Sequence, residues 1–330
     1  MKQSLLALAL VALLFSGCKP PTDGAPPPGA ADAYPNRTIT LIVPWAAGGG
    51  TDRLSRFMAD QLQRELGKPV VVVNRTGGSG AVGHSAGSTA RPDGYTITMG
   101  TFELSTMHWM GISPLTYQDF KPIIALNSDA AAIIVRADAP WKSLQELVAH
   151  IRANPGKLTM SGTSTGGAWD LARAGFQLAA DLPVESVLWA PTQGSAPSLV
   201  ELLGGHIDAV CCSIPEAASQ IEAGQLRALA VMAPQRLTDQ PEVPTVRECG
   251  IDWEAVGWRG LMVPKDTPDA IVEIIHQKVE TIVKSDAFKD FMKKNGFDIT
   301  IRGPKPFEEF LARQDAQWHK VIEAAGYAKQ

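Results

Sequence analysis

Three glycine-rich turns are the segments whose residue types could bind a ligand, and each lies between a predicted strand and a predicted helix. They span residues 44–52, 77–83 and 161–167. Glycine lets the backbone approach a ligand closely, and the first N–H groups of a helix have no partner within it. Such groups attract anions, so the turns predict an anion site. The alternative is that they are only connections, since Gly and Ser are common in βα turns.

The predicted anion site contains no fixed cation. Residues 44–52 and 161–167 have neither Lys nor Arg, and residues 190–195 also lack them. An anion would therefore be held by amides, hydroxyls and water rather than by a guanidinium group. Ligands of open α/β sheets bind at the carboxyl ends of strands, where these segments are expected.

The second turn matches a dinucleotide-binding fingerprint. Gly78, Gly80 and Gly83 have the G-x-G-x-x-G spacing, and Glu103 follows twenty residues after Gly83. However, the motif does not follow the first strand of its domain, and an exported protein has no obvious nicotinamide pool. We therefore predict no dinucleotide and no other cofactor.

The third turn matches the nucleophile elbow of α/β-hydrolases. Residues 162–166 read GTSTG, which would make Ser164 the nucleophile. Asp208 followed by His276 or His319 would give the required chain order of acid and base. Both histidines fall in predicted amphipathic helices, and no oxyanion loop is recognisable upstream. A secreted serine hydrolase using Ser164 remains the main alternative function, and otherwise we predict no catalytic residue.

The composition excludes several other classes. The chain carries a net charge of −4 and has no basic cluster that could neutralise phosphates, so we expect no nucleic-acid partner. It has no C-x-x-C spacing and no H-E-x-x-H or Walker motif, so we expect no metal site. Cys211 and Cys212 lie in an apolar run and are predicted to be buried small hydrophobic residues.

The N-terminus has the features of an export signal. Lys2 precedes an apolar run over residues 5–15, which is shorter than the ~20 residues that span a bilayer. Residues 14–18 resemble a bacterial lipobox, although Phe15 replaces the usual Leu, and they predict acylation of Cys18. The alternative is a plain secretory signal cut nearby. We predict a signal peptide over residues 1–17, a Pro-rich tether over 18–33, and a lipid-anchored protein of the periplasm or cell envelope.

Strand and helix patterns alternate from Tyr34 onward. Alternation of this kind builds a parallel sheet with helices on both faces. The length of 330 residues favours two domains, and the pattern restarts in the middle of the chain. Two crossing strands are expected near residues 126–135 and 253–262, and the late helices are expected to return to the first lobe. The predicted strands are 38–43, 70–73, 95–99, 131–135, 157–161, 207–212 and 226–232, and the predicted helices include 54–66, 81–90, 195–203 and 306–326.

Short blocks along the mature chain resemble the Bug, or TctC-like, family of extracytoplasmic solute receptors of tripartite tricarboxylate transporters. The resemblance runs from about Tyr34 to Gly326. Its blocks are residues 34–39, 42–44, 48–52, 74–75, 92–96, 154–158, 162–167, 202–208, 226–231 and 243–246.

The resemblance implies an α/β fold of the type II periplasmic-binding-protein kind, with two lobes, each a mainly parallel sheet flanked by helices. We expect residues 34–130 plus 257–330 in lobe 1 and 131–256 in lobe 2. The family also implies hinge closure around a small carboxylate or amino acid, and a monomer. Membrane transporter subunits are the expected partners, a sensing role with a kinase is an open variant, and membrane contact is expected only through the N-terminal lipid.

The resemblance also implies which residues bind the ligand. In lobe 1 they are Trp45, Ala46, Gly49, Thr51, Asp52, Ser79, Thr101 and Ser105. In lobe 2 they are Thr163, Ser164, Thr165, Gly166, Thr192, Gln193 and Gly194.

The chain departs from the family pattern near this site. Trp45 stands where Phe or Tyr is commoner, Ala47 where Pro is usual, and Thr192-Gln193 where Tyr-Lys is usual. Glu103 near the cleft could receive an ammonium group or repel a second ligand carboxylate. The identity of the ligand stays open for these reasons.

Overall fold

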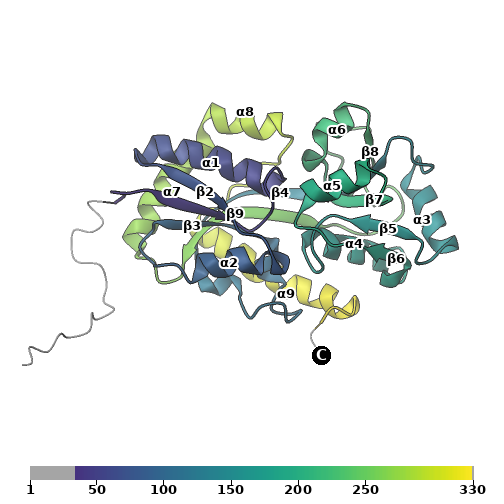
Figure 1. Cartoon of the computed structure of the whole chain (residues 1–330), viewed down its shortest axis with the longest axis horizontal. Coiled ribbons are helices and arrows are strands. Elements are labelled where there is room, and N and C mark those ends of the chain that lie inside the picture. Colours follow the sequence, from purple (N-terminus) through teal and green to yellow (C-terminus); the bar gives the residue numbers. More distant parts are fainter. Residues whose placement is uncertain (1–33, 329–330) are drawn as a thin grey trace, which may run out of the picture.

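The computed structural model describes residues 34–328 (Figure 1). The predicted signal peptide, Cys18 and the tether lie outside the described residues. Figure 1 shows two halves side by side, joined by long strands that run from one into the other. We call the part around the first three strands the first half and the part around the fifth to eighth strands the second half.

The first half contains a parallel sheet with β1 in the centre. Its strands are β1 (Ile39–Val43), β2 (Val70–Asn74) and β3 (Thr96–Thr101). Thr40 pairs with Val71 of β2 and with Thr96 of β3, so the carboxyl ends of these strands meet at one edge. The helices of this half are α1 (Gly50–Leu66), α2 (Ala81–Ser88), α7 (Asp269–Lys284) and α8 (Asp286–Lys294).

Helix α1 shows why the sequence predicted this half well. Leu54, Met58 and Leu62 recur every four residues and are fully buried on one face. Gly67 ends the helix with φ 64°, a left-handed conformation that glycine adopts without steric cost. Burial of this apolar stripe against β1 and α7 fixes the start of α1 beside the cleft.

The second half repeats the parallel arrangement around β5. Its strands are β5 (Leu158–Ser161), β6 (Val187–Trp189), β7 (Ala209–Ser213) and β8 (Leu226–Val231). Strand β5 pairs in parallel with β6 and β7. The helices are α3 (Leu144–Ala153), α4 (Ala168–Ala179), α5 (Ser195–Leu203) and α6 (Ala218–Glu222).

Two crossing strands join the halves into one curled sheet. They are β4 (Phe120–Arg136) and β9 (Val256–Pro264), which correspond to the crossing strands predicted at 126–135 and 253–262. Strand β4 pairs with β9 on one side, and with β7 and β8 farther along the chain. All antiparallel pairings in the sheet involve β4 or β9, so each half is parallel only away from the crossing strands.

The last helix, α9 (Pro304–Ala324), packs across both halves, below the crossing strands in Figure 1. Trp318 makes edge-on contacts with Phe102 of the first half and with Trp253 of the second, at centroid distances of 4.7 and 6.1 Å. Just beyond the helix, the Tyr327 hydroxyl lies 2.6 Å from Nη2 of Arg173 in α4. Helices α7 and α8 contribute to the core of the first half, as expected, but α9 connects the halves.

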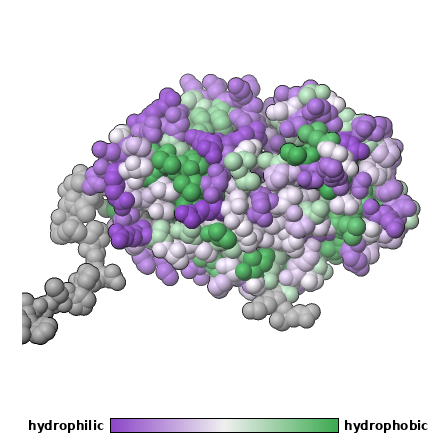
Figure 2. Space-filling view, in the orientation of Figure 1, coloured by the Kyte–Doolittle hydropathy of each residue, from purple (hydrophilic) through white to green (hydrophobic). Residues whose placement is uncertain are grey.

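The surface shows no broad apolar face in the view of Figure 2, where apolar residues form separate small patches. Within residues 34–328, no helix combines the length and the apolar character that crossing a bilayer requires.

Candidate ligand-binding site

A small pocket with a cavity volume of about 40 Å³ lies between the halves. Residues after β1 and β3 line it from the first half, and the turn after β5 lines it from the second. The crossing strand β9 contributes Gly257, Trp258 and Arg259. The pocket therefore sits where the carboxyl ends of the parallel strands from both halves face each other.

Three helices begin at this pocket. Gly50 and Thr51 open α1, Ala168 and Trp169 open α4, and Ser195 and Ala196 open α5, and all of them line the pocket. The first N–H groups of each helix lack intrahelical partners, and each helix start favours an anion by ~0.3–1 kcal/mol. Two of these starts follow the turns at 44–52 and 161–167, and the third follows residues 190–195.

The residues predicted to bind the ligand divide into two groups. Seven line the pocket: Trp45, Ala46, Gly49, Thr51, Thr101, Thr163 and Gly194. Eight do not: Asp52, Ser79, Ser105, Ser164, Thr165, Gly166, Thr192 and Gln193.

Several residues of the second group stabilise the loops around the pocket. The Asp52 carboxylate accepts hydrogen bonds from the N–H of Gly48 at 2.9 Å and from the Asn74 amide at 2.9 Å. The N–H of Gly166 donates to Asp170 at 2.9 Å, and the Thr192 hydroxyl donates to the carbonyl of Gly194 at 3.0 Å. The Ser105 hydroxyl is buried and has no hydrogen-bond partner among the described residues.

Other residues of this group join the two halves directly. The Ser79 hydroxyl of the first half donates to the carbonyl of Thr165 in the second at 2.6 Å. The N–H of Ala46 donates to the carbonyl of Gln193 at 3.1 Å. Such bonds require the halves to touch, so the structure shows the closed arrangement.

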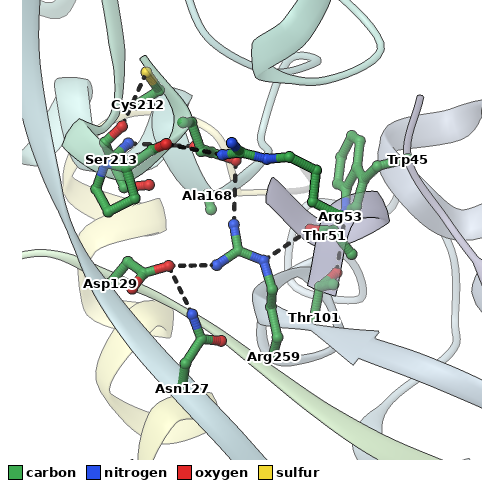
Figure 3. A network of polar contacts seen from close by, with 12 residues as sticks. Trp45, Thr51, Arg53, Thr101, Asn127, Asp129, Ala168, Cys212, Ser213 and Arg259 are labelled. Atoms are coloured by element: carbon green, nitrogen blue, oxygen red, sulfur yellow. Dashed lines mark hydrogen bonds and ion pairs between the residues drawn. The ribbon is translucent and has the colours of Figure 1, made fainter. Parts of the chain in front are cut away.

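A buried arginine stands beside the pocket, although its turns contain no cation. Arg259 of β9 has a side chain that is 5% exposed. Figure 3 shows its guanidinium between Asp129 and Thr51, at 2.6 Å from the Asp129 carboxylate and 2.9 Å from the Thr51 hydroxyl. A second carboxylate, Glu216, lies 3.1 Å away. Burial raises the pKa of Asp129 to about 6, while Arg259 acts to lower it.

Sequence reasoning missed Arg259 and Glu216 because it searched the turns. Arg259 lies inside a strand, and its carboxylate partners are 130 and 43 residues away along the chain. The only signal was an arginine within the apolar stretch of β9, which has to find partners when it is buried.

Glu103 is a further buried acidic residue of the pocket, with 2% of its surface exposed. It lies in a short 3₁₀ turn, η2 (Phe102–Ser105), directly after β3. Its Oε1 accepts a hydrogen bond of 2.8 Å from the N–H of Ala168, the first residue of α4, and its Oε2 accepts one from the Thr101 hydroxyl. A carboxylate of the first half thus occupies a helix start of the second. Burial raises the pKa of Glu103, and these two hydrogen bonds act to lower it.

Thr101 connects Glu103 to two further side chains. The Trp45 indole N–H donates to the Thr101 hydroxyl at 3.3 Å, and the N–H of Thr101 donates to Nε2 of His84 at 3.3 Å. His84 is fully buried, and burial lowers its pKa to about 4. His84 is therefore neutral at neutral pH and holds Thr101 from behind.

The catalytic triad of the hydrolase alternative is not assembled. The Ser164 hydroxyl is buried without a hydrogen-bond partner among the described residues. Asp208 instead accepts from the N–H of Thr159 at 2.8 Å. His319 stacks on Trp109 at a centroid distance of 3.8 Å, so it is engaged elsewhere.

The glycines of both enzyme-like motifs have packing roles. A Cβ on Gly162 would lie 2.1 Å from the carbonyl oxygen of Cys211. A Cβ on Gly83 would lie 2.6 Å from Cα of Pro44 and 2.7 Å from the carbonyl oxygen of Arg75. Close packing against neighbouring backbone therefore accounts for these two glycines without a nucleophile or a dinucleotide.

Two of the three cysteines in the described residues are buried, as the apolar run around them predicted. Cys211 and Cys212 are fully buried and free, whereas Cys249 is partly exposed. In residues 34–328, no group of three or more His, Cys, Asp or Glu side chains is arranged to hold a metal ion.

Comparison with known proteins gives a consistent result. Residues 54–327 match the family described as "Tripartite tricarboxylate transporter family receptor". Protein BugT of Bordetella pertussis is 31% identical over 310 residues, covering 92% of this chain and 94% of BugT. A UPF0065 protein encoded in the gbd 5' region of Cupriavidus necator is also 31% identical over 310 residues, with 92% of each chain covered.

Solved structures agree. A TctC solute-binding protein from Polaromonas has 36% identity and a TM-score of 0.65, covering 88% of this chain and 99% of its own. The periplasmic binding protein BugD has 30% identity and a TM-score of 0.84, covering 90% and 100%. A Rhodopseudomonas palustris protein solved with adipate has 28% identity and a TM-score of 0.83, covering 89% and 99%. These receptors are periplasmic substrate-binding proteins rather than enzymes, and the chain belongs to their family, the tripartite tricarboxylate transporter receptors.

Proposed function

We propose that this receptor captures a small organic carboxylate in the pocket between its halves and delivers it to a tripartite tricarboxylate-type transporter. The observation that carries the proposal is the convergence of the N-termini of α1 and α5 from opposite halves on one pocket. A carboxylate that accepts hydrogen bonds from both would stabilise the closed form, because the open form cannot offer both sets of N–H groups. The relative solved with adipate supports a carboxylate as the ligand class.

The proposed ligand contacts follow from the pocket lining. Thr51 and Gly49 at α1, and Gly194 before α5, lie at the helix starts that would receive the carboxylate. Trp45 and Thr163 would contact the body of the ligand. We assign residues 34–130 plus 257–330 to one lobe and 131–256 to the other, with α9 lying across both.

A thermal-shift screen tests the proposal. The purified receptor is heated with mono-, di- and tricarboxylates and with amino acids. At a ligand concentration one hundred times Kd, the stabilisation should reach ~2.7 kcal/mol. Thr51→Val removes a hydroxyl of the pocket and should reduce the shift, whereas Ser164→Ala should not. Absence of any shift across the whole panel would contradict the proposal.

The serine hydrolase alternative has its own test. An activity-based serine probe should leave Ser164 unlabelled, because this hydroxyl has no hydrogen-bonded base. Covalent labelling that is lost in Ser164→Ala would restore the enzyme hypothesis.

The lipid anchor on Cys18 is likewise a proposal, because this residue lies outside the described part of the chain. Mass spectrometry of the membrane fraction should find a diacylglyceryl-modified Cys18 at the mature N-terminus. An unmodified chain recovered only in the soluble fraction would contradict it.

A further inference from the structure

We propose that Glu103 makes this receptor selective for a ligand with a carboxylate at one end and an ammonium group at the other. The inference rests on the proposed function, since it concerns the same pocket. It gives that pocket two chemically different ends.

One of the three helix starts is already occupied by the protein itself. The Glu103 carboxylate accepts the N–H of Ala168 at 2.8 Å, so it takes the place at α4 that a ligand carboxylate could otherwise fill. Glu103 comes from the first half and Ala168 from the second, so this contact forms only when the halves are closed. A ligand carboxylate is therefore left with the starts of α1 and α5.

The charges beside Glu103 disfavour a second ligand carboxylate. Among the described residues that line the pocket, the charged side chains are Glu103, Glu216 and Arg259. Arg259 is already bound by Glu216 and by Asp129. Glu103 itself forms no ion pair with another described residue, so no cationic side chain in contact with it neutralises its charge. Like charges in a buried site repel strongly because the local dielectric constant is low.

Glu103 also retains acceptor capacity for a cation. An ionised carboxylate offers about four lone-pair positions. The N–H of Ala168 and the Thr101 hydroxyl use two of them. An ammonium group can donate to the others, and its charge would keep Glu103 ionised in spite of burial.

Aromatic side chains around Glu103 fit the same ligand group. Trp45, Trp169 and Trp258 all line the pocket. Trp45 donates its indole N–H to Thr101, whose hydroxyl in turn donates to Glu103, so Trp45 lies close to the carboxylate. The faces of indole rings attract ammonium groups, most strongly where water is excluded. A buried carboxylate among tryptophans is a receptor for a cation.

Calorimetry with two matched ligand series tests the inference. The first series is succinate, glutarate and adipate. The second is β-alanine, 4-aminobutyrate and 5-aminopentanoate, in which an ammonium group replaces one carboxylate. The wild-type receptor should bind the best member of the second series at least about tenfold more tightly than its dicarboxylate counterpart.

Glu103→Gln should abolish or reverse this preference. The glutamine amide keeps the size of the side chain and can still accept the N–H of Ala168, but it carries no charge. Glu308→Gln on the exposed face of α9 removes one negative charge that does not line the pocket and should leave the ratio unchanged.

Each outcome decides between the two proposals. A wild-type preference for dicarboxylates, or a ratio that Glu103→Gln leaves intact, would overturn the role of Glu103 while the receptor function stands. Binding restricted to carboxylates without an ammonium group would do the same. Absence of binding by every compound of both series and of the carboxylate panel would overturn the receptor function, and this inference with it.

Discussion

The starts of α1 and α4 are alike in backbone but differ in what they can bind. Gly49 precedes α1 with φ −73° and ψ 170°, and Gly167 precedes α4 with φ −75° and ψ 171°. Both helices begin in a glycine-rich turn after a parallel strand and line the same pocket. At α4, however, Glu103 accepts the first N–H, whereas at α1 no carboxylate of the turn takes this place. The same local pattern can therefore be a ligand site at one position and a contact between the halves at another.

The region behind α1 should show the largest effect on stability. A Cβ on Gly50 would lie 2.9 Å from Nη2 of Arg259, so the Arg259 cluster packs directly against the start of α1. Arg259→Ala should lower the free energy of unfolding by ~3–5 kcal/mol, because it leaves Asp129 and Glu216 buried without their cation. Urea unfolding measures this loss.

An exposed arginine with two carboxylate partners gives the matched control for this prediction. Arg247 pairs with Asp252 and Glu254, and its side chain is 48% exposed. Arg247→Ala should cost no more than ~1 kcal/mol. If Arg259→Ala and Arg247→Ala lost the same free energy of unfolding, burial would add nothing to the stabilisation that Arg259 provides.

The stability contributed by His84, which holds Thr101 behind the start of α4, should depend on pH. His84 is buried with its pKa near 4, below its ordinary value of 6.5, so the unfolded chain binds a proton more readily than the folded one between these values. The contribution of His84 to stability is complete above pH 6.5 and is lost as the pH falls toward 4, by roughly 3 kcal/mol. In His84→Gln this part of the acid destabilisation should disappear.

Urea titrations of both proteins between pH 7 and 4 measure that difference. As the pH falls, the unfolding free energy of the wild type should decrease more than that of His84→Gln. A difference that stays constant with pH would show that His84 is not held neutral behind Thr101.

The two N-cap glycines provide the smallest and most direct comparison. A Cβ on Gly49 would lie 3.4 Å from the Ser195 hydroxyl, an ordinary contact, whereas on Gly167 it would lie 2.6 Å from the Thr163 hydroxyl. Gly167→Ala should destabilise the protein by ~1–3 kcal/mol through overpacking. Gly49→Ala should stay within ~0.5 kcal/mol of the wild type. If the two variants unfolded at the same temperature, the two turns would not differ in how tightly their glycines are packed.

Most of the fold was predictable because its signals are local. The helix predicted at 195–203 coincides with α5, and the strand predicted at 70–73 differs from β2 by one residue. Apolar periodicity and helix-ending glycines such as Gly67 decide these boundaries. The position of α9 across both halves was not predictable, since its apolar stripe is the same whichever core it covers.

The pocket was predictable only in part, for a related reason. The turns at 44–52 and 161–167 were identified from the sequence because their glycines precede predicted helices. Arg259 and Glu103 owe their roles to partners that are distant in sequence, 65 residues away in the case of Glu103 and Ala168. The sequence raised Glu103 as a departure from the family pattern but could not show that it binds the start of α4.

A crystal structure of the receptor with its tightest-binding carboxylate tests the central claim most directly. The ligand carboxylate should accept hydrogen bonds from the N–H groups of Gly50 or Thr51 at α1 and of Ser195 or Ala196 at α5, with Glu103 still bound to Ala168. A ligand carboxylate on the N–H of Ala168 with Glu103 displaced, or a ligand bound outside this pocket, would contradict the account.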